Sequence, residues 1–167
     1  MGEPAAKPPR APPGRRRAAR LAAVQALYQL DLGGEEVETV ILEFRTHRLT
    51  EGPAQAADPA LFADLVRGAW RRRGELDRLL SQALVADWPI ERLECVLRAL
   101  LRAAVYELLV RHDIPPKVVI NEYLEVAHAF FSEREPQLVN GVLDALAQRL
   151  RGERLSDDAH GNLADGG

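Results

Sequence analysis

VLRALLRAAVYELL, residues 96–109, has the most regular apolar pattern in this chain. Its apolar side chains recur at i, i+1, i+4 and i+5, the spacing of a helix with a wide buried face. They are Val96, Leu97, Leu100, Leu101, Ala104, Val105, Leu108 and Leu109. The pattern predicts a central core helix against which the other elements pack.

Helical periodicity continues on both sides of this stretch. We expect further helices over about residues 16–32, 35–47, 60–83, 117–130 and 136–150. Glycines 33 and 34 end the first of them, and Pro136 fits the first turn of the last. Strand-like alternation bounded by turn signals is absent. The predicted fold is all-α, with two packed bundles of three helices each, or of three helices and a short one.

Two glycines interrupt the long helix expected over residues 60–83. Gly68 and Gly74 each cost about 1 kcal/mol relative to alanine inside a helix. We therefore expect another element to pack closely against the helix at both positions.

The chain divides into one helical domain and two terminal segments. Residues 1–14 are basic and proline-rich, and residues 152–167 are acidic and glycine-rich. Neither segment has apolar surface to bury, so both are predicted to be disordered. The helical domain then spans residues 15–151. The break at Asp87-Trp88-Pro89 divides it into halves of about 15–86 and 87–151.

The composition excludes several classes of protein. No apolar run reaches the roughly 18 residues that a membrane-spanning helix needs. The basic N-terminal segment lacks the apolar core of a secretory signal. The single cysteine, Cys95, cannot form an internal disulfide, which fits a reducing compartment. We therefore expect a cytoplasmic protein that has no contact with a membrane.

Groups that could carry out catalysis or bind a metal are few. Cys95 begins an apolar helix with no histidine at helical spacing, and we interpret it as a small buried hydrophobe. Glu125-x-x-His128, with Glu122 one turn earlier, is the best metal candidate, but the di-iron bundle pattern needs this motif twice. Nucleotide-binding and zinc motifs are absent. The sequence predicts no enzyme, no metal, no cofactor and no small-molecule substrate.

Charge is distributed unevenly along the chain. Residues 1–20 hold six basic residues and one acidic residue, a net charge of +5. Because the net charge of the whole chain is −3, the remaining residues together carry −8. Arg15, Arg16, Arg17 and Arg20 crowd a helix start, where the helix dipole disfavours cations. Such a cluster is typical of phosphate binding, and arginine also stacks on unpaired bases. A merely solvated basic flank is the alternative.

Two residues further along the same helix extend the candidate site. Gln25 and Tyr28 lie one to two turns beyond the arginines. Tyr28 either stacks on a base or packs in the core, and the sequence leaves both open.

Four segments carry a resemblance to a known family: RRRAARLAAVQALYQLD (15–31), LRALLRAAVYELL (97–109), IPPKVVINEYLEVAHAFF (114–131) and LVNGVLDALAQRLR (138–151). Together they resemble the NusB family of transcription antitermination factors. The pairing of KVVINE with VNGVLD about twenty residues later is the most specific match. The resemblance covers about residues 15–151.

The resemblance implies a NusB-like fold and a non-enzymatic role in RNA binding. Such proteins bind single-stranded boxA RNA in nascent transcripts of ribosomal RNA operons. They do so with NusE, a small-subunit ribosomal protein, in a complex with RNA polymerase that suppresses termination. The RNA-binding residues implied here are Arg15, Arg16, Arg17, Arg20, Gln25, Tyr28, Lys117, Asn121, Leu138 and Asn140.

Some of these positions have a structural alternative. Asn121 and Asn140 can instead bond neighbouring backbone or fill a gap between helices. Gly141 can allow another element to approach closely. Glu122 is expected to pair with a basic residue such as Arg102.

The resemblance also contains one departure. Leu97 stands where many family members have an acidic residue, in a region implied to face NusE. Leucine there is expected to make that patch more apolar.

Two competing functions remain at the level of sequence. NusB-like domains also precede the catalytic domain of certain ribosomal RNA cytosine methyltransferases, and such a chain would act as a targeting domain only. Alternatively, the chain is a helical protein-interaction module whose arginines are only solvated.

Overall fold

The computed structural model describes residues 13–49, 57–84, 88–132 and 134–152. Within these ranges every regular element is a helix. The elements are α1 (Pro13–Gly33), α2 (Val37–Glu43), η1 (Phe44–Arg48), α3 (Pro59–Arg71), α4 (Arg73–Ala83), η3 (Ile90–Arg92), α5 (Cys95–Val110), α6 (Pro116–Phe130), α7 (Arg134–Ala147) and η4 (Gln148–Gly152). The predicted all-α fold class is confirmed.

The two terminal segments expected to be disordered lie almost entirely outside the described residues. The exceptions are Pro13 and Gly14, which begin α1, and Gly152, which ends η4. No helix in the described ranges is both long enough and apolar enough to span a lipid bilayer.

Helix α5 is the centre of the molecule, as its apolar pattern predicts. It packs against α1, α3, α4, α6 and α7. Leu100, Leu101 and Leu108 are completely buried, and Leu97 is nearly so. A helix that contacts neighbours on all sides needs apolar residues around most of its circumference. The wide stripe of residues 96–109 meets that need.

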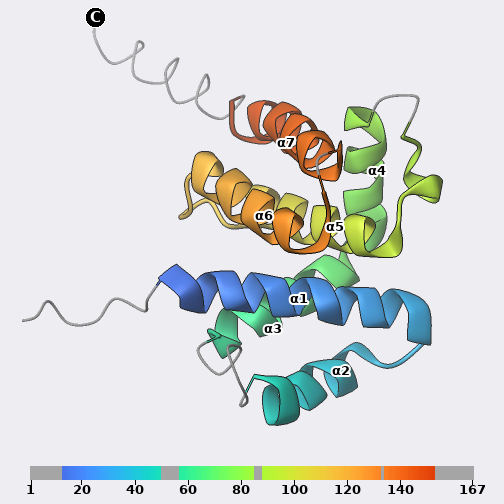
Figure 1. The fold of residues 1–167 in the computed structure, drawn as a ribbon, viewed down its shortest axis with the longest axis vertical. Helices are drawn as coiled ribbons and strands as arrows, with labels where there is room; N and C mark the ends of the chain where they lie inside the picture. Colours follow the sequence, from blue (N-terminus) through green and yellow to red (C-terminus); the bar gives the residue numbers. More distant parts are fainter. Residues whose placement is uncertain (1–12, 50–56, 85–87, 133, 153–167) are drawn as a thin grey trace, which may run out of the picture.

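The remaining helices form two groups around α5 (Figure 1). Helices α1, α2 and α3 pack together on one side, and α4, α6 and α7 lie on the other. Helix α4 was expected to accompany α1–α3, but it packs on α5 and α7. The division of the domain into halves at about residue 86 stays a prediction.

Local signals fix several helix ends. Gly34 adopts a φ of 67°, the left-handed conformation that stops α1 and that glycine tolerates best. Asp58 caps α3 by accepting hydrogen bonds from the N–H groups of Ala60 and Leu61, at 3.0 and 3.1 Å. Pro59 and Pro116 occupy first-turn positions, where a missing N–H costs little.

The single long helix expected over residues 60–83 is wrong. The backbone leaves helical geometry at Arg72 (φ −99°, ψ 12°), so that α3 and α4 are separate helices. Helix α3 packs against α1 and α5, whereas α4 packs against α5 and α7. One straight helix cannot present its apolar stripe to both sets of neighbours, and the break redirects it.

The expectation of close packing at glycine is confirmed at one position and wrong at two. A methyl group on Gly68 would overlap the phenol ring of Tyr106 on α5. At Gly74 and at Gly141 the same group would meet open space. Gly68 is therefore the glycine that lets two helices approach, here α3 and α5.

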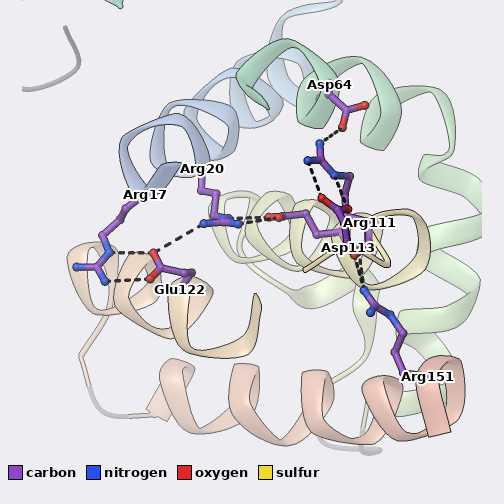
Figure 2. Close-up of polar contacts among 8 residues, drawn as sticks. Arg17, Arg20, Asp64, Arg111, Asp113, Glu122 and Arg151 are labelled. Atoms are coloured by element: carbon purple, nitrogen blue, oxygen red, sulfur yellow. Dashed lines mark hydrogen bonds and ion pairs between the residues drawn. The ribbon is translucent and has the colours of Figure 1, made fainter. Parts of the chain in front are cut away.

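The C-terminal end of α5 is capped by a side chain from far along the sequence. Arg151, in η4, donates hydrogen bonds to the carbonyls of Leu108 and Arg111, both at 2.7 Å, and of Ile114 at 3.2 Å. Helix C-termini leave carbonyl groups without partners, and cations there also complement the helix dipole. Figure 2 shows Arg151 reaching from the last helix towards this turn.

Candidate nucleic-acid interface

The arginine cluster occupies the first two turns of α1. No acidic residue lies in the first turn, so no carboxylate of that turn offsets these cations. The structure nevertheless gives the four arginines different surroundings. Arg16 and Arg17 are exposed, Arg15 is half-buried, and Arg20 is buried. The cluster is therefore not one uniform basic patch.

Arg20 points into the protein and pairs with a carboxylate of α5. Its Nε and Nη2 donate to the two carboxylate oxygens of Glu107, at 2.8 and 2.9 Å. The side chains of Arg20 and Glu107 are 2% and 0% exposed, and the Arg20 guanidinium lies 5.9 Å from the centre of the Tyr123 ring. Burial raises the pKa of Tyr123 well above its ordinary value, and the negative charge of Glu107 adds to the effect.

This burial argues against direct RNA contact by Arg20, and we assign it a structural role. The sequence contained a signal for that role. Arg20, Val24 and Leu27 are spaced i, i+4 and i+7, which places Arg20 on the apolar face of α1. Its partner Glu107 likewise interrupts the apolar run of residues 96–109. Two opposite charges on two core faces are the pattern of a buried ion pair.

Arg17 pairs with α6 at the surface. Its Nε and Nη2 donate to the carboxylate oxygens of Glu122, at 3.0 and 3.1 Å (Figure 2). These hydrogen bonds, together with the negative charge of Glu122, raise the pKa of Arg17 above its ordinary value. The side chains of Arg17 and Glu122 are 49% and 18% exposed, so water still reaches the arginine.

Glu122 pairs with a basic residue, as expected, but that residue is Arg17 and not Arg102. Arg102 instead donates to both carboxylate oxygens of Asp77 on α4, at 2.7 Å each, and to Asp31 on α1 at 3.3 Å. Helices α1, α4 and α5 meet at Arg102, whereas Glu122 faces the start of α1. The sequence indicated that Glu122 pairs with a residue of another helix, but it did not indicate which helix.

Gln25 and Tyr28 are both exposed on α1. Tyr28 is 37% exposed, which rules out a fully buried core position. Both residues line a cavity of about 500 Å³. Its other lining residues include Gln29, Arg48, Val96 and Phe130. Aromatic faces, amide groups and a guanidinium in one hollow suit a flat, hydrogen-bonding group.

Phe130 and Arg48 were not among the residues that the sequence singled out. Their own segments carry no signal for this cavity, because they come from α6 and η1 and meet α1 only in the fold.

The candidates of the second half lie on α6 and α7. Lys117, Asn121 and Asn140 are exposed, and Leu138 is half-buried. Helix α6 packs against both α1 and α7, so the three candidate-bearing helices lie side by side (Figure 1). The two asparagines are exposed, which gives no support to the structural alternative of filling a gap between helices.

Leu97 does not form the exposed apolar patch expected from the sequence. Its side chain is 1% exposed and belongs to the core. The neighbouring Arg98 is half-buried, and its Nη2 donates to Asp31 at 2.8 Å. Leu97 thus adds to the buried apolar face of α5, and the adjoining surface at Arg98 stays polar.

The remaining chemically reactive candidates are dispersed. Cys95 is half-buried rather than fully buried, and its Sγ lies 3.7 Å from Nη2 of Arg98. Glu125 and His128 are exposed, while Glu122 is held by Arg17. In the described ranges no three histidine, cysteine or acidic side chains gather as metal ligands would.

Comparison with known proteins gives one consistent result. Residues 17–148 match the sequence profile described as the NusB family. The transcription antitermination protein NusB of Agrobacterium fabrum (strain C58) is 47% identical over 156 residues, which is 91% of this chain and 94% of that protein.

Solved structures agree with the sequence match. NusB of T. maritima has a TM-score of 0.69 and 32% identity, over 84% of this chain and 96% of that one. A chain from a crystal structure of the antitermination factors NusB and NusE in complex with dsRNA has a TM-score of 0.68 and 28% identity. That match covers 81% of this chain and 97% of the other.

Proposed function

The chain belongs to the NusB family, and on that premise we propose that it binds the boxA sequence of nascent ribosomal RNA transcripts together with NusE. Membership makes the protein a transcription antitermination factor rather than an enzyme. In the proposed role this chain and NusE form a heterodimer. The heterodimer joins RNA polymerase in the cytoplasm and suppresses premature termination of transcription. A solved relative that holds both NusE and RNA supports the two partners.

The observation that carries the proposal is the composition of the exposed face of α1. Arg16 and Arg17 stand exposed at its start, and Tyr28 and Gln25 line a cavity further along the same helix. Guanidinium groups bind phosphate, and an exposed aromatic ring provides a stacking surface for an unpaired base. One helix thus presents both kinds of group that single-stranded RNA requires.

The proposed surface extends from α1 to α6 and α7. Lys117 on α6 adds a cation, and Asn121 lies one turn beyond it at i+4, on the same side of the helix. Asn140 on α7 offers an amide that can hydrogen-bond a base edge, with Leu138 beside it. Arg15 remains part of the proposed surface, and Arg20 supports it from the interior.

Fluorescence anisotropy with labelled RNA tests the proposal. We expect a boxA single strand to bind more tightly than a scrambled strand, and much more tightly once NusE is added. A duplex of the same sequence belongs in the comparison, because the solved relative contains dsRNA. Equal, weak binding of the boxA and scrambled strands with NusE present would favour a protein-interaction module instead.

The salt dependence of binding tests the role of the arginines. If Arg16 and Arg17 each contact one phosphate, replacing both by alanine flattens the slope of log K against log salt by about 1.4. The matched control is Arg45→Ala with Arg71→Ala, two exposed arginines on η1 and α3 that remove the same charge. The control slope should stay within about 0.3 of wild type. Equal flattening in both proteins would remove the start of α1 from the RNA surface.

A further inference from the structure

Glu122 lies between two arginines that differ in burial (Figure 2). Its Oε2 is 3.0 Å from Nε of the exposed Arg17 and 3.8 Å from Nη1 of the buried Arg20. Its Oε1 accepts a second hydrogen bond from Arg17 Nη2 at 3.1 Å. One carboxylate on α6 therefore contacts the arginine cluster of α1 at two of its four members.

The contact with Glu122 occupies one of the two edges of the Arg17 guanidinium that can hold a phosphate with two hydrogen bonds. A guanidinium can hold a carboxylate or a phosphate with two parallel N–H groups, either through its Nε–Nη2 edge or through its two Nη groups. In this structure the Nε and Nη2 groups of Arg17 already donate to Glu122. A phosphate that binds Arg17 through the Nε–Nη2 edge must first displace the carboxylate.

The surroundings make that displacement feasible. Arg17 is 49% exposed and can turn towards solvent. Glu122 would not be left without a positive neighbour, because Arg20 remains beside it. Arg20 is fixed in place, since its Nε and Nη2 donate to Glu107 and only Nη1 points towards Glu122. The buried arginine can therefore retain the carboxylate when the exposed arginine leaves.

We propose that Glu122 competes with RNA phosphate for Arg17 and so lowers the affinity of the free protein for RNA. This inference rests on the proposed RNA-binding function. It makes Glu122 an intramolecular stand-in for phosphate rather than a residue that positions Arg17 for RNA. The two roles predict opposite effects of removing the carboxylate charge.

The first test measures RNA affinity by anisotropy with the boxA single strand. Glu122→Gln should bind roughly two- to fivefold more tightly than wild type, the factor that corresponds to one exposed ion pair. Glu125→Gln is the matched control. It removes the same charge from the same helix, and Glu125 acts on Arg17 through its charge without a hydrogen bond. The control should tighten binding by less than half as much.

A double-mutant cycle identifies Arg17 as the target of the effect. In the Arg17→Gln background, Glu122→Gln should change the RNA affinity no more than Glu125→Gln does. Thermal unfolding of each variant verifies that the fold is retained. Weaker or unchanged binding by Glu122→Gln, or an advantage over Glu125→Gln that survives without Arg17, would overturn the proposal.

A second probe separates this inference from the proposed function. Inorganic phosphate is titrated while the NMR signal of the Arg17 Nε–H group is followed. The signal should move at several-fold lower phosphate concentration in Glu122→Gln than in wild type. Equal midpoints would overturn competition by Glu122, whether or not RNA binds. Failure of the wild-type protein to bind boxA RNA, with a shifted phosphate midpoint, would instead refute the RNA function and leave the competition intact.

Discussion

Arg20 and Glu107 form an ion pair from which water is almost excluded, because the two side chains are 2% and 0% exposed. Moving two charges out of water is costly, and the attraction between them only compensates when the geometry is good. Here both carboxylate oxygens receive a hydrogen bond from the guanidinium. The pair joins α1 to α5 in a defined orientation, and its loss on one side leaves an uncompensated charge.

Removing one partner should therefore be far worse than removing both. We expect Glu107→Leu to lower the free energy of unfolding by about 3–5 kcal/mol, because Arg20 then remains buried and loses both of its hydrogen bonds to a carboxylate, with only Glu122 left at 3.8 Å from its Nη1. The double variant Arg20→Met with Glu107→Leu should lie within about 2 kcal/mol of wild type. Urea unfolding measures both. A double variant as unstable as the single one would show that the charges contribute more than apolar packing can replace.

The same double variant also tests the role of Arg20 in RNA binding. If Arg20 only supports the surface, the variant keeps its affinity for the boxA strand. A loss of affinity in a folded double variant that persists in the Glu122→Gln background, where the contact between Arg20 and Glu122 plays no part, would return Arg20 to the RNA-binding residues.

At the residue scale the sequence located the arginine cluster but not the exposure of its members. The periodicity of α1 places Arg20 on the apolar face of the helix. Burying an unpaired charge is costly, however, so this position is only expected once the partner, Glu107, is known. That partner is 87 residues away. The same limit applies to Glu122, whose partner Arg17 lies 105 residues away. Local patterns give the face of a helix, and only the fold gives what that face meets.

At the scale of elements, the contact of α3 with α5 depends on a glycine. Gly68 leaves room for the ring of Tyr106, whose hydroxyl donates a hydrogen bond to Asp64 at 2.8 Å. Burial, and then this contact with Asp64, raises the pKa of Tyr106 to about 12. The ring packs against α3 at Gly68, and its hydroxyl, which this shift keeps protonated even in alkaline solution, donates to Asp64.

Alanine substitutions at two glycines should have opposite effects on stability. Gly68→Ala inserts a methyl group into the space of the Tyr106 ring and should cost about 1–3 kcal/mol. Gly74→Ala meets open space in α4 and should stabilise the protein by up to about 1 kcal/mol. Urea unfolding compares the two proteins with wild type. Stabilisation by both substitutions would mean that the Tyr106 ring can move aside.

The helix boundaries show which local signals were sufficient. Gly34 and Pro116 act within one turn, and the ends of α1 and α6 fall near the predicted residues. The break at Arg72 has no proline and no cap, so residues 60–83 look continuous in the sequence. It follows from the different neighbours of α3 and α4, which is a property of the tertiary structure.

At the scale of the whole molecule, a network of charged groups joins three helices. Asp31 at the end of α1 accepts hydrogen bonds from Arg98 at 2.8 Å and from Arg102 at 3.3 Å, and Arg102 also binds Asp77 on α4. Burial works to raise the pKa of Asp31, but the hydrogen bond from Arg98 and the charge of Arg102 outweigh it and lower the pKa below its ordinary value. The ionised carboxylate is thus favoured in the folded protein.

The lowered pKa of Asp31 makes the free energy of unfolding depend on pH. A carboxylate whose pKa is lower in the folded than in the unfolded state contributes its full stabilisation above the unfolded value, about 3.9 for aspartate. The contribution is lost as the pH falls through the lower, folded-state pKa. Asp31→Asn removes it at every pH. We expect this variant to be about 1–2 kcal/mol less stable than wild type near pH 7, with a smaller difference near about pH 3.

Urea unfolding of wild type and Asp31→Asn at both pH values measures how far the difference in their stability decreases in acid. Glu38→Gln on α2 is the control, because the hydrogen bond from Arg67 also lowers the pKa of Glu38 but the pair is exposed and screened by solvent. Its stability should follow wild type at both pH values. A difference between Asp31→Asn and wild type that stays constant or grows in acid would mean that the α1–α4–α5 junction does not depend on an ionised Asp31. Arg102 would then be held by Asp77, and Arg98 by packing and its contact with Cys95.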